Sequence, residues 1–541
     1  MGDTNINTNV NTPSNSARLV ALPSVRGWRL FLGYIGAFLI FVGFLILVPL
    51  IIIAFHPEEA DVYPWFLIPG ASSIVLGVGL YALIFKRRRA RLQKWESYLL
   101  LLSVWIVAII VGAIPYRLSG YLNFSQSVFE SASGFTTTAI SVIDTEDSLA
   151  LCGYVFQFFR CWMLFVGGIG LTLIITSAIS DANGLSLYNL EGHNDRLLPN
   201  VVKSARIIFL IYFVYIIIGV CAYVACGMPV FDAVCNSISS LSTGGYSLHA
   251  SGIAYYNSIG IEIITCILML LGATNFMIHF AIMRAKFKHF FYHCELYCAL
   301  IMAILFLPPI IIGCNYVLQD VASKYPGSAY LSNPAYSIRY GVFMFISTVT
   351  STGFTNTPPE AYLQFESLPS FAYIAIFLCM VIGGQAGSTA GGVKQIRVVQ
   401  IFKQAYWYIR GSIDNSHIIH SRTIIRYGKK EAISDDELHN AASFILIYIA
   451  IVLLGAFALT CCSVDYTFDV ALFQFTSFFT NSGVAAGAVT LTTPLGVYWI
   501  TIIGMVIGRL EPIIFMLLLA RGLKSASEKA KKNFIISKLR K

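Results

Sequence analysis

Long apolar runs dominate this sequence, and each is long enough to cross a lipid bilayer as a helix. A bilayer core of about 30 Å needs about 20 consecutive apolar residues in a helix. Hydrophobic residues make up 57% of the 541 residues and charged residues only 12%, whereas a soluble domain carries roughly 25% charged residues. We therefore predict an all-α polytopic membrane protein with about ten transmembrane helices. The predicted spans are residues 28–55, 65–85, 97–115, 155–178, 205–226, 258–283, 294–315, 369–400, 441–462 and 493–520.

A pattern that occurs four times follows the first two spans. A spanning run leads into a short, half-polar segment, and a second spanning run comes after it. The half-polar segments are SASGFTTTAIS (131–141), SISSLSTGGYS (237–247), STVTSTGFTNT (347–357) and TSFFTNSGVAAG (476–487). Repeats of this kind predict two extra N-terminal spans and four units, each a span, a pore helix and a span, around one central pore.

The predicted division of the chain follows these repeats. It consists of a disordered N-terminus (1–25), two extra spans (26–90), repeats at 95–180, 200–288 and 290–402, a cytoplasmic loop (403–438), a fourth repeat (439–525) and a basic cytoplasmic tail (526–541).

The net charge of +9 is concentrated in short stretches between apolar runs. These stretches are residues 86–94, 284–288 and 394–430 and the C-terminal tail. Counting spans puts all of them on one side, and an excess of Lys and Arg is typical of cytoplasmic loops. We therefore expect both termini to be cytoplasmic and the half-polar segments to open outward. A charge distributed in this way gives no sign of nucleic acid binding.

The half-polar segments are suited to a cation filter. Non-helical backbone at membrane depth must be buried in protein or line an aqueous path. Each segment follows about ten residues of helical character, as a filter strand follows a pore helix, and a ring of carbonyls can replace the water shell of a cation. Asp and Glu are missing from the four segments, which argues against a calcium-type carboxylate ring. Ordinary Ser/Gly-rich turns are the alternative, and four copies in matching units favour the filter.

Aligning the segments by pattern gives twelve candidate ion-binding residues. They are Thr137, Thr138 and Ala139; Ser242, Thr243 and Gly244; Ser351, Thr352 and Gly353; and Asn481, Ser482 and Gly483. Ala139 stands where the other segments have glycine. A left-handed conformation at an L-residue costs about 1–2 kcal/mol, so we expect either that this quarter of the filter is strained or that its carbonyl turns away.

A glycine-rich stretch interrupts the predicted span at 369–400. Each glycine inside a helix costs about 1 kcal/mol relative to alanine, so residues 383–392 are expected to be unwound below the filter. Tight helix packing through small residues is an equal alternative. The candidate gating residues are Gly383, Gly384, Gly387, Ser388, Thr389, Ala390, Gly391, Gly392 and Lys394.

Arg509 lies deep in the last apolar run. An ionisable residue there should face the protein interior and have a partner. Glu511 is either that partner or a residue at the cytoplasmic mouth. Lys394 either pairs with Glu511 or extends its ammonium toward the membrane surface.

Two motifs carry a resemblance to a known family. GGQAGSTAGGVKQIR (383–397) matches the signature G-G-x-A-G-S-T-A-G-G-[IV]-K almost residue for residue, and GRLEP (508–512) is a second match. GGIG (167–170) and residues 275–279 match more weakly. Over about residues 28–525 the chain resembles the membrane subunit of the Trk/Ktr/HKT superfamily of potassium transporters, in its TrkH-like branch.

The resemblance implies a function and partners. It implies K⁺ uptake across the cytoplasmic (inner) membrane, an intramembrane gating loop and a pore arginine at Arg509. It also implies a homodimer bound to cytoplasmic, nucleotide-binding, TrkA-like (RCK) regulatory subunits. The family pattern has glycine where this chain has Ala139, and a non-glycine residue there accompanies Na⁺ permeation in the plant HKT branch. Na⁺ is therefore expected to permeate as well.

Other functions fit the sequence less well. Symport of K⁺ with Na⁺ or H⁺ remains the alternative, although the sequence shows no inverted repeat with a midplane carboxylate. An enzyme would need a cluster of intramembrane catalytic groups, and none is evident. Walker A and Rossmann motifs are missing. We therefore expect no enzymatic activity and no nucleotide bound by this chain, with K⁺ as the transported ion.

Overall fold

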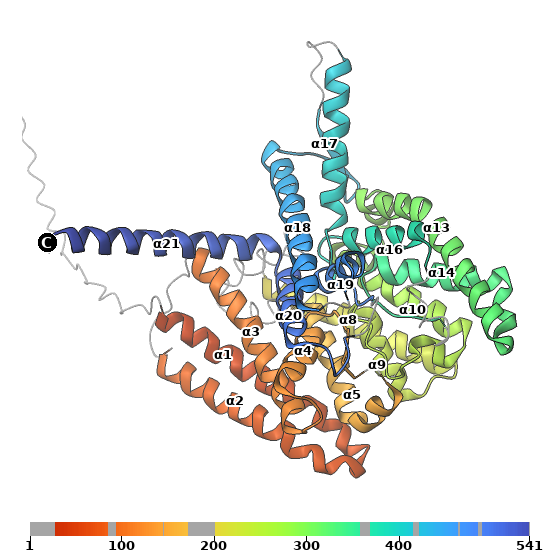
Figure 1. Ribbon diagram of the computed structural model, residues 1–541, viewed down its shortest axis with the longest axis horizontal. Helices are drawn as coiled ribbons and strands as arrows, with labels where there is room; N and C mark the ends of the chain where they lie inside the picture. Colours follow the sequence, from red (N-terminus) through yellow and green to blue (C-terminus); the bar gives the residue numbers. More distant parts are fainter. Residues whose placement is uncertain are drawn as a thin grey trace, which may run out of the picture.

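Figure 1 shows the computed structural model, which describes residues 28–84, 94–143, 145–170, 201–357, 368–414, 421–463, 466–484 and 489–539. The predicted disordered N-terminus and residues 86–93 of the first basic loop lie outside the described residues. Residues 171–178 of the predicted span 155–178 and residues 485–487 of the fourth half-polar segment also lie outside them. The described part is predominantly helical, as expected, and includes one antiparallel hairpin of two short strands.

The helices have the length and composition of membrane spans. Within the described ranges, seven helices are long and apolar enough to cross a bilayer, or nine if each of two sharply bent pairs is one span. About ten were expected. The difference lies in the predicted span 369–400, where α16 (Ser370–Ile382) has only 13 residues because the helix stops at the glycine-rich stretch. The helix α17 (Gln395–Ile413) begins beyond that stretch.

The two extra N-terminal spans form a tightly packed antiparallel pair, α1 (Trp28–Leu47) and α2 (Tyr63–Ile84) (Figure 1). They are joined by the 3-10 turns η1 (Val48–Ala54) and η2 (Pro57–Val62). Glycines let the two backbones approach closely. A Cβ added at Gly77 would lie 2.6 Å from the Gly36 carbonyl oxygen, and one at Gly43 would lie 2.6 Å from the Gly70 carbonyl oxygen.

The described residues after α2 contain four units, each with a long first helix, a short helix of 12–16 residues and a second helix of 13–24 residues. Their bounds are α3 (Lys94–Leu118), α4 (Phe124–Phe135) and α5 (Glu146–Ile169); α8 (Val201–Ala225), α9 (Val230–Leu241) and α10 (Ile259–Gly272); α13 (Cys294–Lys324), α14 (Pro334–Val349) and α16; and α18 (Asp435–Cys462), α19 (Phe468–Thr480) and α20 (Leu495–Arg509). Every residue of α4 after Phe124 is buried. The helix α4 therefore lies inside a shell of other helices, and the last turns of α9, α14 and α19 are also buried.

The second long helix of each unit stops at a similar level. Near the ends of α5, α10 and α20, the residues Gly167, Gly272 and Gly508 each lie against a carbonyl in the last turn of a short helix. Beyond this level α10 turns by 105° into α11 (Phe276–Met283), and α20 turns by 106° into α21 (Pro512–Leu539). The fold is therefore interrupted in one layer directly below the ends of the short helices.

The remaining elements lie in the connections. They are α12 (Lys288–Phe291), η3 (Gly252–Tyr256), η4 (Pro326–Ser332), β1 (Thr423–Arg426) and β2 (Lys429–Ala432). The predicted cytoplasmic loop 403–438 contains the end of α17, which projects beyond its neighbours at the top of Figure 1, and the hairpin, in which Thr423 pairs with Ala432. The predicted tail 526–541 falls on the end of α21, with residues 540 and 541 outside the described part.

The packing of α1 against α2 leads to a prediction about stability. Gly77→Leu should destabilise the protein by about 1–3 kcal/mol, since the new side chain must push the helices apart. Gly79→Leu is the matched control, because a Cβ at Gly79 meets nothing within 4 Å. Thermal unfolding of the detergent-solubilised protein measures both. Equal melting temperatures for the two variants would contradict this account of the pair.

Candidate functional site

A serine in the last turn of each short helix sets the course of the segment that follows. The hydroxyls of Ser133, Ser239 and Ser347 donate to the carbonyl oxygen seven residues later, at 2.6, 2.9 and 2.7 Å. The carbonyls of the same serines, and of Ser477, accept from the N–H five residues later at 2.9–3.1 Å. These bonds fold all four segments alike and give them a common alignment. The residues that follow each short helix can therefore be compared position by position.

Each segment contains two left-handed residues, separated by one other residue. The first left-handed position is taken by Thr137, Thr243, Ser351 and Asn481, with φ of 51–60°. The second is taken by Ala139, Gly245, Gly353 and Gly483, with φ of 54, 86, 83 and 72°. Of the two alternatives that the sequence left open for Ala139, the structure therefore has the strained, left-handed one, at a cost of about 1–2 kcal/mol.

The structure corrects the alignment of the second segment by one residue. Ser242 belongs to the end of α9, where its N–H donates to the Ile238 carbonyl. The residue equivalent to Ala139 is Gly245 and not Gly244. The sequence STGG offers two glycines, and pattern alone matched the first, whereas the bond from Ser239 to the Tyr246 carbonyl fixes the second.

The four segments are neighbours around one axis. A Cβ added at Gly353 would lie 2.5 Å from the Ser482 carbonyl oxygen, and one at Gly483 would lie 2.5 Å from the Thr138 carbonyl oxygen. A Cβ at Gly245 would likewise collide with the Thr352 carbonyl oxygen. Each second-position glycine thus faces a carbonyl of the next repeat. The carbonyls of adjacent segments come together at the centre of the molecule.

The glycine-rich stretch lies directly below these segments and is not helical. The predicted interruption is therefore present, and a continuous, tightly packed helix is not. Thr389 Oγ1 donates to the Gly272 carbonyl at 2.9 Å and accepts from Thr243 Oγ1 at 3.0 Å. The Gly391 N–H donates to Ser351 Oγ at 2.6 Å. All the candidate gating residues from Gly383 to Lys394 lie in this loop between α16 and α17.

Arg509, at the end of α20, joins the loop to the first repeat. Its guanidinium donates to the Thr389 carbonyl at 2.8 Å and to the Gly167 carbonyl at 2.6 Å. One side chain thereby connects α20, α5 and the loop. The partners of Arg509 include two backbone carbonyls, which the sequence did not reveal.

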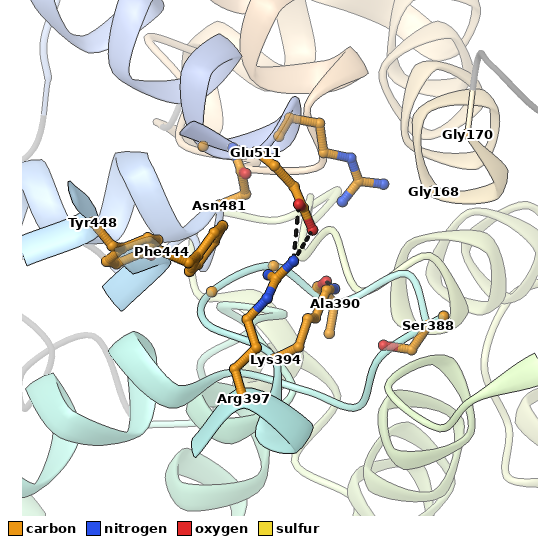
Figure 2. A pocket seen from close by; sticks show the side chains of 15 residues that line it. Gly168, Gly170, Ser388, Ala390, Lys394, Arg397, Phe444, Tyr448, Asn481 and Glu511 are labelled. Atoms are coloured by element: carbon orange, nitrogen blue, oxygen red, sulfur yellow. Dashed lines mark hydrogen bonds and ion pairs between the residues drawn. The ribbon is translucent and has the colours of Figure 1, made fainter. Parts of the chain in front are cut away.

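The ion pair near Arg509 differs from the one that the sequence suggested. Glu511 accepts from Arg397 Nη2 at 2.8 and 2.9 Å (Figure 2). The Lys394 ammonium donates to the Ala390 carbonyl, so the pair of Lys394 with Glu511, one of the two alternatives for Lys394, is not formed. Arg397 closes the GGQAGSTAGGVKQIR motif, but nothing in the sequence linked it to a residue 114 positions away.

A cavity of about 50 Å³ separates the loop from the fourth segment and the end of α20. Its lining includes Ala390 and Lys394 of the loop, Asn481 of the fourth segment, and Arg509 and Glu511 (Figure 2). This volume has room for only a few water-sized molecules. The loop and Arg509 therefore narrow the space below the four segments.

The β-hairpin holds the loop from its other side. The Asn275 side chain donates to the Tyr427 hydroxyl at 3.0 Å, and its backbone N–H donates to Gln385 Oε1 of the loop at 3.0 Å. Glu295 Oε1 accepts from the N–H groups of Ala386 and Ile396 at 2.8 and 3.1 Å. The sequence analysis missed these residues, apart from the weak family match at Asn275.

Sequence reasoning also missed a buried ion pair behind the first segment. Arg160 Nε donates to Glu130 Oε1 at 3.0 Å, and both side chains are buried. Glu130 lies in α4 and Arg160 in α5, and a pair 30 residues apart leaves no local signal. A lone Glu and a lone Arg within apolar stretches were the only signs.

The family model described as TrkH, cation transport protein, matches residues 66–531. The chain belongs to the TrkH family. An uncharacterized cation transporter of Methanocaldococcus jannaschii is 28% identical over 495 residues, covering 90% of this chain and 94% of that protein. The Trk system potassium uptake protein TrkH of Halomonas elongata is 28% identical over 454 residues, covering 82% and 88%.

A second potassium uptake protein and a solved structure are similar to this TrkH-family chain. The Trk system potassium uptake protein TrkG of Escherichia coli is 25% identical over 497 residues, 88% of this chain and 96% of that protein. The crystal structure of the potassium transporter TrkH from Vibrio parahaemolyticus matches with a TM-score of 0.76 at 22% identity, over 91% of this chain and 99% of that one. At this identity the match establishes a shared fold. Together with its apolar helices, family membership makes this chain an integral membrane protein.

The corrected alignment of this TrkH-family chain can be tested with two adjacent glycines. Gly245→Ala should abolish cation flux, because an L-residue at φ +86° is strained and its Cβ would collide with the Thr352 carbonyl. Gly244→Ala should be milder, because its Cβ meets only the flexible Leu164 side chain. Rubidium-86 uptake into proteoliposomes measures both. A more severe effect of Gly244→Ala would contradict the alignment.

Proposed function

We propose that this chain is the pore-forming subunit of a potassium uptake system in the cytoplasmic (inner) membrane. The observation that carries the proposal is the set of four segments with one backbone geometry, whose carbonyls meet between adjacent repeats. Relatives named as Trk system potassium uptake proteins support the choice of K⁺. On this proposal the chain is a transporter and not an enzyme, and the ion is its cargo.

The filter binds K⁺ through neutral oxygens. Backbone carbonyls can replace the hydration shell of a monovalent cation, and a membrane potential supplies about 2.3 kcal/mol per charge per 100 mV for inward movement. The C-terminal ends of the four short helices add negative potential nearby. The filter residues are Thr137, Thr138 and Ala139; Thr243, Gly244 and Gly245; Ser351, Thr352 and Gly353; and Asn481, Ser482 and Gly483.

The loop from Gly383 to Lys394 is the gate of this pore. Its backbone lies against the ends of the filter segments, and the cavity beside it is small. The Arg509 guanidinium holds the loop in place and also opposes a cation electrostatically. Opening therefore requires the loop to leave the Arg509 side chain.

The membrane orientation of the chain and its partner subunits are inferred from the charge of its loops and from the family resemblance. Both termini, α17 and the hairpin lie in the cytoplasm on this proposal. The chain forms a homodimer and binds nucleotide-binding, TrkA-like (RCK) regulatory subunits. The exposed strand Lys429–Ala432 and the projecting helix α17 offer them a docking surface.

Symport of K⁺ with Na⁺ or H⁺ is the competing function. It would use an ionisable group at the level of the filter, and Glu130 is such a group. However, the Glu130 carboxylate already accepts from Ser141, Val142 and Arg160. An uncoupled cation pore is therefore the better interpretation, and its reversal potential should not depend on the proton gradient.

Reconstitution tests the proposed function. Currents are recorded from the purified chain in liposomes, with K⁺ on one side of the membrane and Na⁺ on the other. The reversal potential should have the sign expected for a membrane that is more permeable to K⁺ than to Na⁺. Protein-free liposomes are the control. A complete lack of cation flux would refute the proposal, and a reversal potential that moves with the proton gradient would favour symport.

Ala139 should make the filter permeable to Na⁺ as well. Ala139→Gly removes a strain of about 1–2 kcal/mol, and we expect the K⁺/Na⁺ permeability ratio to rise by about threefold or more. The same bi-ionic recordings give the ratio. An unchanged ratio in the variant would mean that this residue does not limit selectivity.

Arg509→Ala should increase K⁺ flux without any regulatory subunit. The substitution removes two charged hydrogen bonds, each worth about 1.5–3 kcal/mol, from the state in which the loop is held, and we expect about tenfold more flux. Arg284→Ala is the control, because Arg284 is exposed and lies over the Phe280 ring. K⁺ flux no higher than in the parent protein would show that the Arg509 side chain does not hold the loop in the closed state.

A further inference from the structure

A buried ion pair lies directly behind the first filter segment. The Glu130 side chain is 0% exposed and that of Arg160 is 3% exposed, and Arg160 Nε donates to Glu130 Oε1 at 3.0 Å. A buried pair of this kind contributes little net stability, since desolvation offsets the attraction between the charges. Its presence in the interior therefore calls for another role.

The Glu130 carboxylate holds the strand that leaves the filter. Ser141 Oγ lies 2.9 and 3.0 Å from its two oxygens, and the Val142 N–H donates to Oε2 at 3.3 Å. Arg160 Nη2 donates to the Ile143 carbonyl at 3.4 Å. Three successive residues are thus fixed, beginning two positions after Ala139.

The pair also reaches the neighbouring repeat. The centre of the Arg160 guanidinium lies 4.3 Å from the centre of the Tyr246 ring, and the Tyr246 hydroxyl donates to the Glu130 carbonyl at 3.2 Å. Tyr246 directly follows Gly245 in the second filter segment. Both charges therefore contact the strand of the first segment, and Arg160 also contacts Tyr246, next to the filter in the second.

This arrangement is specific to one quarter of the filter. The serines that align the four segments place Asn236, Met344 and Gln474 at the position of Glu130, and all three are uncharged. The first repeat is also the one with a non-glycine residue, Ala139, at the second left-handed position. The charged pair and the strained residue thus occur in the same quarter.

We propose that Glu130 and Arg160 are positioning residues for ion specificity, which hold the strand beyond Ala139 so that this strained quarter keeps its carbonyls in the filter. The inference rests on the proposed function. The bonds of Ser133 fix the segment before and at Ile140, and the ion pair fixes it from Ser141 to Ile143. Because the segment is fixed on both sides, Ala139 stays in the left-handed conformation, which is unfavourable for alanine.

A double-mutant cycle separates positioning from a general effect on folding. Glu130→Gln should lower the K⁺/Na⁺ permeability ratio by about threefold or more in the parent protein. In the Ala139→Gly background the same change should have little effect, because glycine adopts the left-handed conformation without strain. An equal loss in both backgrounds, or no loss in either, would overturn the proposal.

The pair of Glu262 with Arg339 provides the matched control. Arg339 Nη2 lies 2.7 Å from Glu262 Oε1, and the pair joins α10 to α14 near the start of the short helix, at the opposite end from its filter segment. Glu262→Gln should leave the permeability ratio unchanged. A change as large as that of Glu130→Gln would show that any lost ion pair perturbs selectivity and would overturn the proposal.

Ser141→Ala keeps the test decisive if Glu130→Gln fails to fold. It removes only the hydroxyl that joins the strand to Glu130, from a half-buried position, and should lower the ratio in the same direction. An unchanged ratio for Ser141→Ala would refute the positioning role. The parent protein is recorded alongside, so that a lack of K⁺ flux in the parent refutes the proposed function and not this inference.

Discussion

The centre of the molecule depends on a hydroxyl at the end of each of three short helices. Ser133, Ser239 and Ser347 reach past the left-handed residues and bind the carbonyl on the far side. Backbone at membrane depth must find its hydrogen bonds within the protein, and this bond satisfies one carbonyl while leaving those before it free to face the axis. In the fourth repeat Ser477 instead lies 3.3 Å from the Ser482 hydroxyl, so this quarter departs from the pattern.

The same requirement for hydrogen bonds within the protein explains the contacts of the glycine-rich loop below the short helices. The second long helices stop beneath the short helices, and interrupted helices expose polar groups that the loop and its neighbours then pair. Thr389 and Gln385 bind backbone groups of the α10–α11 turn, and Arg509 binds carbonyls of the loop and of α5. These two charged hydrogen bonds therefore join the end of α20, the loop and α5.

The sequence predicted the features that depend on composition and spacing, and it failed where distant residues meet. The helical class and the unwound glycine stretch depend on local composition and were predicted correctly, whereas the predicted spans 258–283, 369–400 and 493–520 are each bent or interrupted. The alignment of the second segment was wrong by one residue, because two adjacent glycines cannot be distinguished without the bond of Ser239. The pairs of Arg397 with Glu511 and of Glu130 with Arg160 join residues 114 and 30 positions apart. No periodicity could have matched these partners.

The four quarters of the site are similar in geometry but different in sequence. In a pore assembled from four identical chains, every substitution occurs four times and changes the whole ring at once. In this chain a single codon change alters only one of the four segments. Ala139 is such a difference, and the other three segments keep glycine at the equivalent position. If the proposed function is correct, ion preference can therefore be adjusted in small steps during evolution, each of which leaves three of the four segments unchanged.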